Sequence, residues 1–259
     1  MRHVLPAEWL KLHSVRSSRL AILLALGGVL LGFGIAQMAV GMYDSASPAQ
    51  QARARIAELE EVVLIVPQLS LGILGVLAMT SEYATGLIRT SLTVVPRRWP
   101  VLTAKATVVG VIGLATGPVV VFGTHLVCRW VIGDRFSGLY QAPFSGKLPL
   151  LVALSLTVPV FALLGLGLGA ILRSTAGGIT LLVGLVYVIP MIVGNLPGPW
   201  NEWLGSVMIS ALARQISGDL TTPGLYGTSL PPPMAAVLLA CYAVLPVVAG
   251  LWLLQRRDT

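Results

Sequence analysis

Titratable side chains are scarce within the long apolar runs of this sequence, and the one pair with helical spacing is His125 and Arg129. Residues four apart share one face of a helix, so the two side chains would lie together near the outer end of such a run. A proton relay would also need carboxylates, and the centres of the runs contain no Asp or Glu. We interpret the two residues as an interfacial pair that reaches toward the outer headgroups, with a proton relay as the alternative.

Other catalytic and ligand-binding patterns are missing. The sequence has no H-E-x-x-H, no G-x-S-x-G and no paired acid motif, and its Gly146-Lys147 dipeptide lacks the flanking residues of a P-loop. Cys128 and Cys241 lie in apolar stretches without C-x-x-C spacing, which is typical of packing thiols. We therefore expect no catalytic residue, no metal and no cofactor bound by this chain, which would not hydrolyse ATP alone.

The stretch SEYATGLIRTSLTVVPRRWPVLTAK, residues 81 to 105, lies between the second and third apolar runs, has a mixed polar, basic and apolar character, and is the best functional clue in the sequence. Glu82 directly follows an apolar run, Gly86 permits a turn, and Pro96 would end a local helix. A short helix from about Tyr83 to Thr93 would present one polar face to the cytoplasm. The basic side chains that surround Trp99 at the membrane surface are those of Arg97, Arg98 and Lys105.

The elements that position these residues follow from composition. The chain has 259 residues, of which 56% are hydrophobic and 10% are charged, whereas a soluble domain has roughly 25% charged residues. We predict an all-α integral membrane protein, because apolar runs of about 20 residues cross a bilayer as helices. The six predicted spans are residues 20–42, 62–80, 101–132, 148–172, 176–194 and 233–254, and together with residues 1–19 and 195–232 they form one transmembrane domain, 1–259.

Basic residues orient the chain. With the N-terminus inside, the cytoplasmic side holds 11 of the 17 Lys and Arg residues and three of the 10 acids, as the positive-inside rule requires. An even number of spans then puts both termini in the cytoplasm. The net charge of +7 lies in short blocks between the spans, which argues against a nucleic-acid partner.

The first 19 residues combine an apolar stripe with charges in the manner of a helix lying flat in the membrane interface. The polar or interfacial side chains of this predicted helix are Glu8, Trp9, Lys11 and Arg16. A solvated N-terminal tail is the alternative.

Two outer segments are predicted. Residues 48–61 contain good helix formers after Pro48 and are expected to form a short external helix. Residues 195–232 begin with a Pro/Gly turn and continue into an amphipathic stretch that lies in the outer interface or re-enters the membrane. Making residues 200–217 a seventh crossing would place Arg256 and Arg257 outside, against the charge rule.

The 81–105 stretch and the topology together resemble the permease subunits of ABC-2 type transporters, in particular standalone permeases of actinobacterial exporters for drugs, antibiotics or peptides. The first cytoplasmic loop of that family typically contains a Glu, then a Gly, then Leu, Pro and a basic residue, and it ends in a Lys that opens the next helix. The matching residues here are Glu82, Gly86, Leu92, Pro96, Arg98 and Lys105.

The resemblance implies a subunit of a multi-pass exporter in the bacterial inner membrane, with ATP and Mg on two separate ATPase subunits. Its permease partner would be a second copy or a related chain, and lipid would surround both. The implied ATPase-coupling loop comprises Glu82, Tyr83, Gly86, Arg89, Leu92, Pro96, Arg97 and Arg98, with Glu82 and Arg89 facing the ATPase. The alternative is an ordinary basic loop in which Glu82 pairs with a nearby Arg at the helix end.

Glycines four apart can bring helices close together, either between permeases or within one subunit. Three pairs have this spacing inside predicted spans: Gly28 with Gly32, Gly113 with Gly117, and Gly165 with Gly169.

The favoured function is therefore the permease of an ATP-driven exporter for a hydrophobic or amphipathic substrate such as a drug, antibiotic, peptide or lipid. An ATP-independent transporter or channel remains the main alternative, and it would be expected to contain intramembrane acids or half-helices. A membrane-embedded enzyme and a non-transporting scaffold remain as further alternatives.

Overall fold

The computed structural model describes residues 4–85, 99–218 and 230–256, and within these ranges every regular element is a helix. The first half contains α1 (Val4–Ser14), α2 (Arg16–Asp44), α3 (Pro48–Gln51), α4 (Leu59–Val63), α5 (Ile65–Ala84) and α7 (Trp99–Ile132). The second half contains α8 (Arg135–Gly138), η1 (Leu139–Gln141), α9 (Phe144–Leu172), α10 (Thr175–Val183), η2 (Gly184–Val188), α11 (Ile189–Gly194), α12 (Trp200–Ser206), α13 (Ile209–Ser217) and α14 (Pro232–Arg256).

Six helical segments are long and apolar enough to cross a membrane, as the sequence predicts: Arg16–Asp44, Leu59–Ala84, Trp99–Ile132, Phe144–Leu172, Thr175–Gly194 and Pro232–Arg256. Residues 200–217, which the charge rule excludes as a seventh crossing, form α12 and α13, of 7 and 9 residues. At 1.5 Å per residue, neither helix exceeds about 14 Å, which is too short to cross a bilayer.

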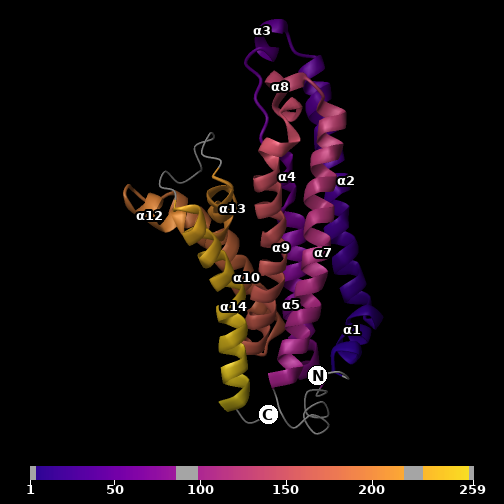
Figure 1. The fold of residues 1–259 in the computed structure, drawn as a ribbon, viewed down its shortest axis with the longest axis vertical. Coiled ribbons are helices and arrows are strands. Elements are labelled where there is room, and N and C mark those ends of the chain that lie inside the picture. The colour runs from indigo at the N-terminus through magenta and orange to yellow at the C-terminus, as the bar shows by residue number, and fades with distance from the viewer. Residues whose placement is uncertain (1–3, 86–98, 219–229, 257–259) are drawn as a thin grey trace.

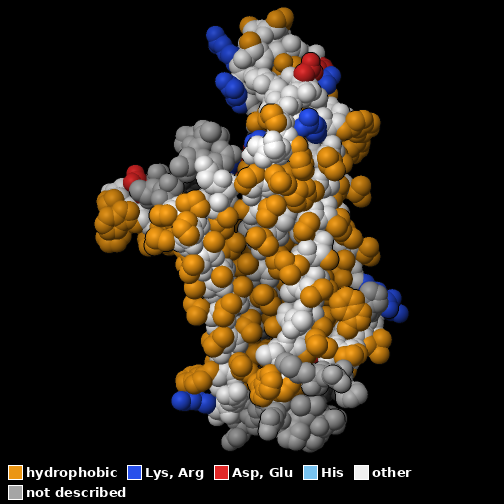
Figure 2. Space-filling model, viewed as in Figure 1, with side chains coloured by type: hydrophobic (Ala, Val, Ile, Leu, Met, Phe, Trp, Pro, Cys, Tyr) orange, Lys and Arg blue, Asp and Glu red, His pale blue; other side chains and the backbone are white. Residues whose placement is uncertain are grey.

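The spans form an elongated bundle around α9 (Figure 1), which is packed by α5, α7, α10, α13 and α14. α1 and the end of α14 lie at one end of the bundle, which we call the inner end after the predicted orientation. α3 and α8 lie at the opposite, outer end. Figure 2 shows hydrophobic side chains over the middle of the visible face and basic side chains toward its two ends, as expected of a surface that meets lipid.

All three glycine pairs serve packing within the subunit. A Cβ atom on Gly32 of α2 would lie 2.8 Å from a methyl group of Thr124 in α7, and one on Gly113 of α7 would lie 2.6 Å from the Cα of Pro159 in α9. One on Gly165 of α9 would collide with the carbonyl oxygen of Gly72 in α5. The other glycine of each pair, Gly28, Gly117 or Gly169, also lies against a neighbouring helix of the same subunit.

The short external helix predicted within residues 48–61 is present, but it covers only the first four residues of that stretch. A helix does begin at Pro48, after a capping box formed by Ser47 and Gln50, but it ends at Gln51. The chain then has no helix until Leu59, and Ala54 and Ile56 pack against a buried cluster that includes Cys128, Ile132 and Phe136. Burial of these apolar side chains outweighs the helix propensity of the segment.

The N-terminal helix α1 is distinct from α2 and meets it at a bend. Val15, between the two helices, has extended backbone angles, φ −80° and ψ 128°. This one residue lets α1 fold back and pack against α2 and α7 at the inner end of the bundle (Figure 1).

Candidate functional site

Four charged side chains from three helices meet at the inner end, and we call them the inner cluster: Glu8 and Lys11 of α1, Glu82 of α5 and Lys105 of α7. The Lys105 ammonium lies 2.6 Å from a Glu8 carboxylate oxygen and 2.8 Å from one of Glu82. Lys11 lies 2.9 Å from Glu8 and 3.0 Å from the same Glu82 oxygen. Two ammonium groups and two carboxylates thus balance one another.

Burial makes the Lys105 pairings the central ones. The side chains of Lys105, Glu8 and Glu82 are 4%, 4% and 6% exposed, whereas that of Lys11 is 44% exposed. Partial burial would lower the pKa of Lys11, but its hydrogen bonds to Glu8 and Glu82 outweigh this effect and raise that pKa. The second oxygen of Glu82 is buried without a hydrogen-bond partner among the described residues.

Two residues of the inner cluster are not where the sequence pattern placed them. Glu8, expected on the polar face of an interfacial helix, points into the bundle, while Trp9 is 47% exposed. Glu82, expected to face an ATPase, is buried and continues α5. The alternative, a charged partner at the helix end, is closer to the structure, except that the partners are lysines rather than an arginine.

The other predicted coupling residues are only partly described. Gly86, Arg89, Leu92, Pro96, Arg97 and Arg98 lie outside the described residues. Tyr83 belongs to α5, and the guanidinium carbon of Arg173, just after α9, lies 5.1 Å from the centre of its ring. Arg16 is exposed at the start of α2. The contact between Arg173 and the Tyr83 ring is a cation–π interaction, and it adds a second link at the inner end, between α5 and the end of α9.

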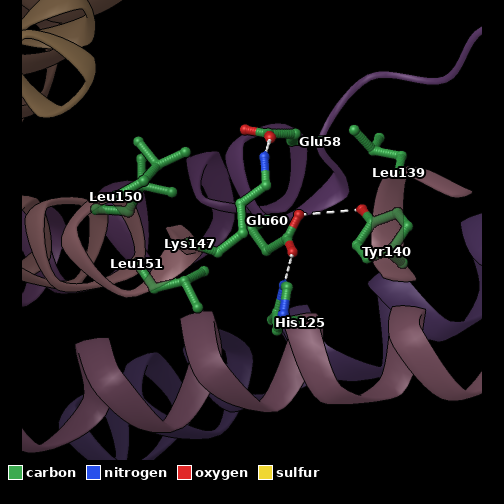
Figure 3. A pocket seen from close by; sticks show the side chains of 9 residues that line it. Glu58, Glu60, His125, Leu139, Tyr140, Lys147, Leu150 and Leu151 are labelled. Carbon is green, nitrogen blue, oxygen red and sulfur yellow. Dashed lines mark hydrogen bonds and ion pairs between the residues drawn. The ribbon is translucent and has the colours of Figure 1, made fainter. Parts of the chain in front are cut away.

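A second buried polar group lies toward the outer end, and we call it the outer triad: Glu60 of α4, His125 of α7 and Tyr140 of η1 (Figure 3). One Glu60 oxygen contacts Nδ1 of His125, and the other accepts a hydrogen bond of 3.0 Å from the Tyr140 hydroxyl. The backbone N–H of Leu59 donates to the Tyr140 oxygen at 2.9 Å. The three residues are 5%, 3% and 2% exposed.

This triad corrects the interpretation of His125 as a headgroup-facing residue. Its ring is buried against Glu60, and Arg129, one turn farther out, donates to the carbonyl oxygen of Ala142 at 3.1 Å. The two residues therefore have different partners. Burial, followed by the negative charge of Glu60, raises the pKa of the Tyr140 hydroxyl, so that it remains a proton donor.

An ion-pair network adjoins the outer triad. Lys147, in the first turn of α9, pairs with Glu58, and Arg214 of α13 lies 3.2 Å from Glu58 and 2.7 Å from Glu61. These contacts fasten α13 to the chain around α4 and to the start of α9. Arg214 and its partners thus hold part of the predicted outer segment against the bundle.

Sequence reasoning missed the contributions of Glu58, Glu60, Tyr140, Lys147 and Arg214. A usable signal was the concentration of three acids, Glu58, Glu60 and Glu61, immediately before an apolar run. Acids in that position would need buried or interfacial cations as partners. Within the described residues, no group of three or more His, Cys, Asp or Glu side chains is placed to hold a metal.

Chemically, the inner cluster is a set of ion pairs that joins three helices, and the outer triad is a series of hydrogen-bond donors and acceptors.

No protein-family model matches the sequence, and no curated protein matches it.

Proposed function

We propose that this chain is the permease subunit of an ATP-binding-cassette exporter, working with a second permease and two separate ATPase subunits. The observation that supports this most is the position of the inner cluster. It joins α1 to the end of α5 and the start of α7, and α5 and α7 are the helices that flank the loop resembling the ABC-2 coupling segment. A permease driven by a partner needs such a physical contact between the docking segment and the spans.

The proposed coupling path differs from one in which Glu82 touches the ATPase. The docking surface would be formed by the loop residues, with Arg89 among them. Movement of that loop would then act on Glu82 and Lys105, which border it, and through Glu8 on α1. A rigid-body shift of the spans would expose the translocation path alternately to the two sides.

The proposed placement is the inner membrane of a bacterium, with both termini in the cytoplasm. The described beginning of α1 and the end of α14 lie at the same end of the bundle (Figure 1). α1 would lie near the inner headgroups, and α12, with Trp200 and Trp203 57% and 62% exposed, would lie near the outer ones.

The proposed cargo is hydrophobic or amphipathic. The buried acids of the described spans lie near the span ends, where Glu82 is paired with Lys105 and Glu60 contacts His125. A charged cargo would need further buried counter-charges to offset its loss of hydration.

An ATP-independent transporter is the second candidate, and one observation favours it. Glu60 beside His125 is a buried acid next to a titratable base, which is the arrangement that proton-coupled transport uses.

The test is purification of the tagged protein from its native membrane in mild detergent, with identification of the proteins that accompany it. We expect a P-loop ATPase in stoichiometric amount. Reconstitution of the purified complex should then give cargo movement that requires ATP. A protein that purifies alone even when nucleotide is added to favour ATPase binding, and that transports without ATP, would overturn the proposal in favour of the second candidate.

A further inference from the structure

The depth of the outer triad can be judged from two tryptophans on one uninterrupted helix. Trp99 and Trp130 lie near the two ends of α7 and are 40% and 77% exposed. Their separation along the helix is about 46 Å at 1.5 Å per residue, close to the ~40–45 Å thickness of a bilayer with both headgroup regions included. Exposed tryptophans favour those regions. His125 is about 7.5 Å inward from Trp130 along the helix, and therefore lies near the outer edge of the hydrocarbon.

The hydrogen bonds of the outer triad leave one atom open. Glu60 uses both oxygens, one toward His125 and one toward Tyr140, and the Tyr140 oxygen accepts from the Leu59 N–H. Nε2 of His125 is buried and has no partner among the described residues. His125 also lines a cavity of about 10 Å³, bordered by Glu60, Tyr140 and Lys147 (Figure 3). This volume is about the size needed to hold one water molecule.

The charges around the triad indicate what Nε2 binds. Glu58 and Glu61 are offset by Lys147 and Arg214, and Arg129 is directed to the carbonyl oxygen of Ala142. Cys128 and Tyr140, the other titratable groups that face the triad, are uncharged when they hold their protons. The negative charge of the Glu60 carboxylate therefore has no other cation to balance it among these groups. Glu60 is buried, and an unpaired buried charge is costly.

We propose that His125 is a proton-binding site, in which Nδ1–H donates to Glu60 and a proton on Nε2 makes the ring an imidazolium. Without that proton, an ionised Glu60 and a neutral His125 would have a net charge of −1, and with it their charge is zero. No bond other than N–H forms or breaks, and one water in the cavity can deliver the proton. The proton-bound pair fastens α4, which carries Glu60, to α7 and, through Tyr140, to η1.

This site does not depend on what drives transport, because it concerns the outer ends of the helices. A permease with ATPase partners and a transporter without them could both contain it. Its test can therefore fail or succeed separately from that of the proposed function.

The test uses the full-length protein with nitrogen-15-labelled histidine in lipid nanodiscs at neutral pH. The chain has three histidines, and the His125→Gln variant identifies the signals of His125. We expect protons on both ring nitrogens of His125 in the unchanged protein and loss of the Nε2 proton in Glu60→Gln. Glu61→Gln is the matched control, because it changes a neighbouring acid that pairs with Arg214, and it should leave His125 doubly protonated.

Hydrogen exchange provides the second readout. Backbone amides of η1 and of the start of α4 should exchange at least about tenfold faster in Glu60→Gln than in Glu61→Gln, because only the former loses the charged hydrogen bond to His125 that joins α4 to α7. A neutral His125 beside an intact Glu60 would overturn the proposal, and this comparison within the unchanged protein needs no variant to fold. Retention of both ring protons in Glu60→Gln would overturn it as well.

Discussion

The ammonium nitrogen of Lys105 lies 2.8 Å from a carboxylate oxygen of Glu82, so one buried ion pair joins the two helices that flank the connection between the second and third spans. The same ammonium group lies 2.6 Å from Glu8. The N-terminal helix is therefore attached to the same point. A displacement of α1, of the end of α5 or of the start of α7 would act on a cluster that is packed among these three helices.

Replacing Lys105 with Met should destabilise the protein strongly. It would leave Glu8 and Glu82 buried with only the half-exposed Lys11 as a cation, and removing one partner of a buried pair costs about 3–5 kcal/mol. Lys11→Met makes the same chemical change in the same cluster, but the Lys11 side chain is 44% exposed, and such a pair contributes about 1 kcal/mol or less. Unfolding in mixed micelles measures the free energy of unfolding of both variants. Equal losses of stability would mean that burial does not set the strength of these ion pairs.

Changing Glu82 to Gln should separate ATPase binding from coupling, if the proposed function holds. Glu82 is 5% exposed, so ATPase association should be unchanged. The amide of Gln keeps a hydrogen-bond acceptor but has no charge, so the contact with Lys105 should weaken. ATP-driven transport should therefore fall about tenfold or more. Arg89→Gln, in the loop proposed to dock, should instead weaken association.

Co-purification and transport assays on the same two variants decide between these outcomes. Loss of ATPase association in a folded Glu82→Gln protein would contradict the internal role of Glu82 and restore its assignment to the docking surface.

The six spans were predictable because their signal is local. A run of about 20 apolar residues is recognised without knowledge of its neighbours, and all six predicted runs correspond to helices of the structure. Prolines within the runs did not mislead the prediction, since Pro118 and Pro159 lie inside continuous helices.

The buried charge clusters were not predictable in the same way, because their members are far apart in the chain. Glu8 and Lys105 are separated by 97 positions, and Glu60 and His125 by 65. A helical pattern can place Glu8 on the polar face of α1, but it does not state whether that face meets water or another helix. Here it meets α7, where Lys105 replaces the water that Glu8 would otherwise bind.

Substituting Ala for Gly165 should destabilise the fold, although Ala is the better helix former. The added Cβ would collide with the carbonyl oxygen of Gly72, and backbone cannot move aside as a side chain can, so we expect a loss of about 1–3 kcal/mol or more. Gly34→Ala in α2 is the control, because a Cβ there has no atom within 4 Å. It should stabilise slightly, and equal effects at the two positions in an unfolding assay would exclude close α5–α9 packing as the cause.

Tyr140 should make the stability of the protein fall at alkaline pH. Burial and the charge of Glu60 raise its pKa in the folded state above the ordinary value of 10.0. Below about pH 10 the phenol is protonated in both states, and its contribution is fully present. Above that value the unfolded chain loses the proton while the folded protein keeps it, so the free energy of unfolding falls by up to about 1.4 kcal/mol per pH unit.

The Tyr140→Phe variant lacks this dependence, and its stability between about pH 9 and pH 11 should decline less steeply than that of the unchanged protein. Parallel declines in the two proteins would show that the Tyr140 hydroxyl ionises equally in the folded and unfolded states.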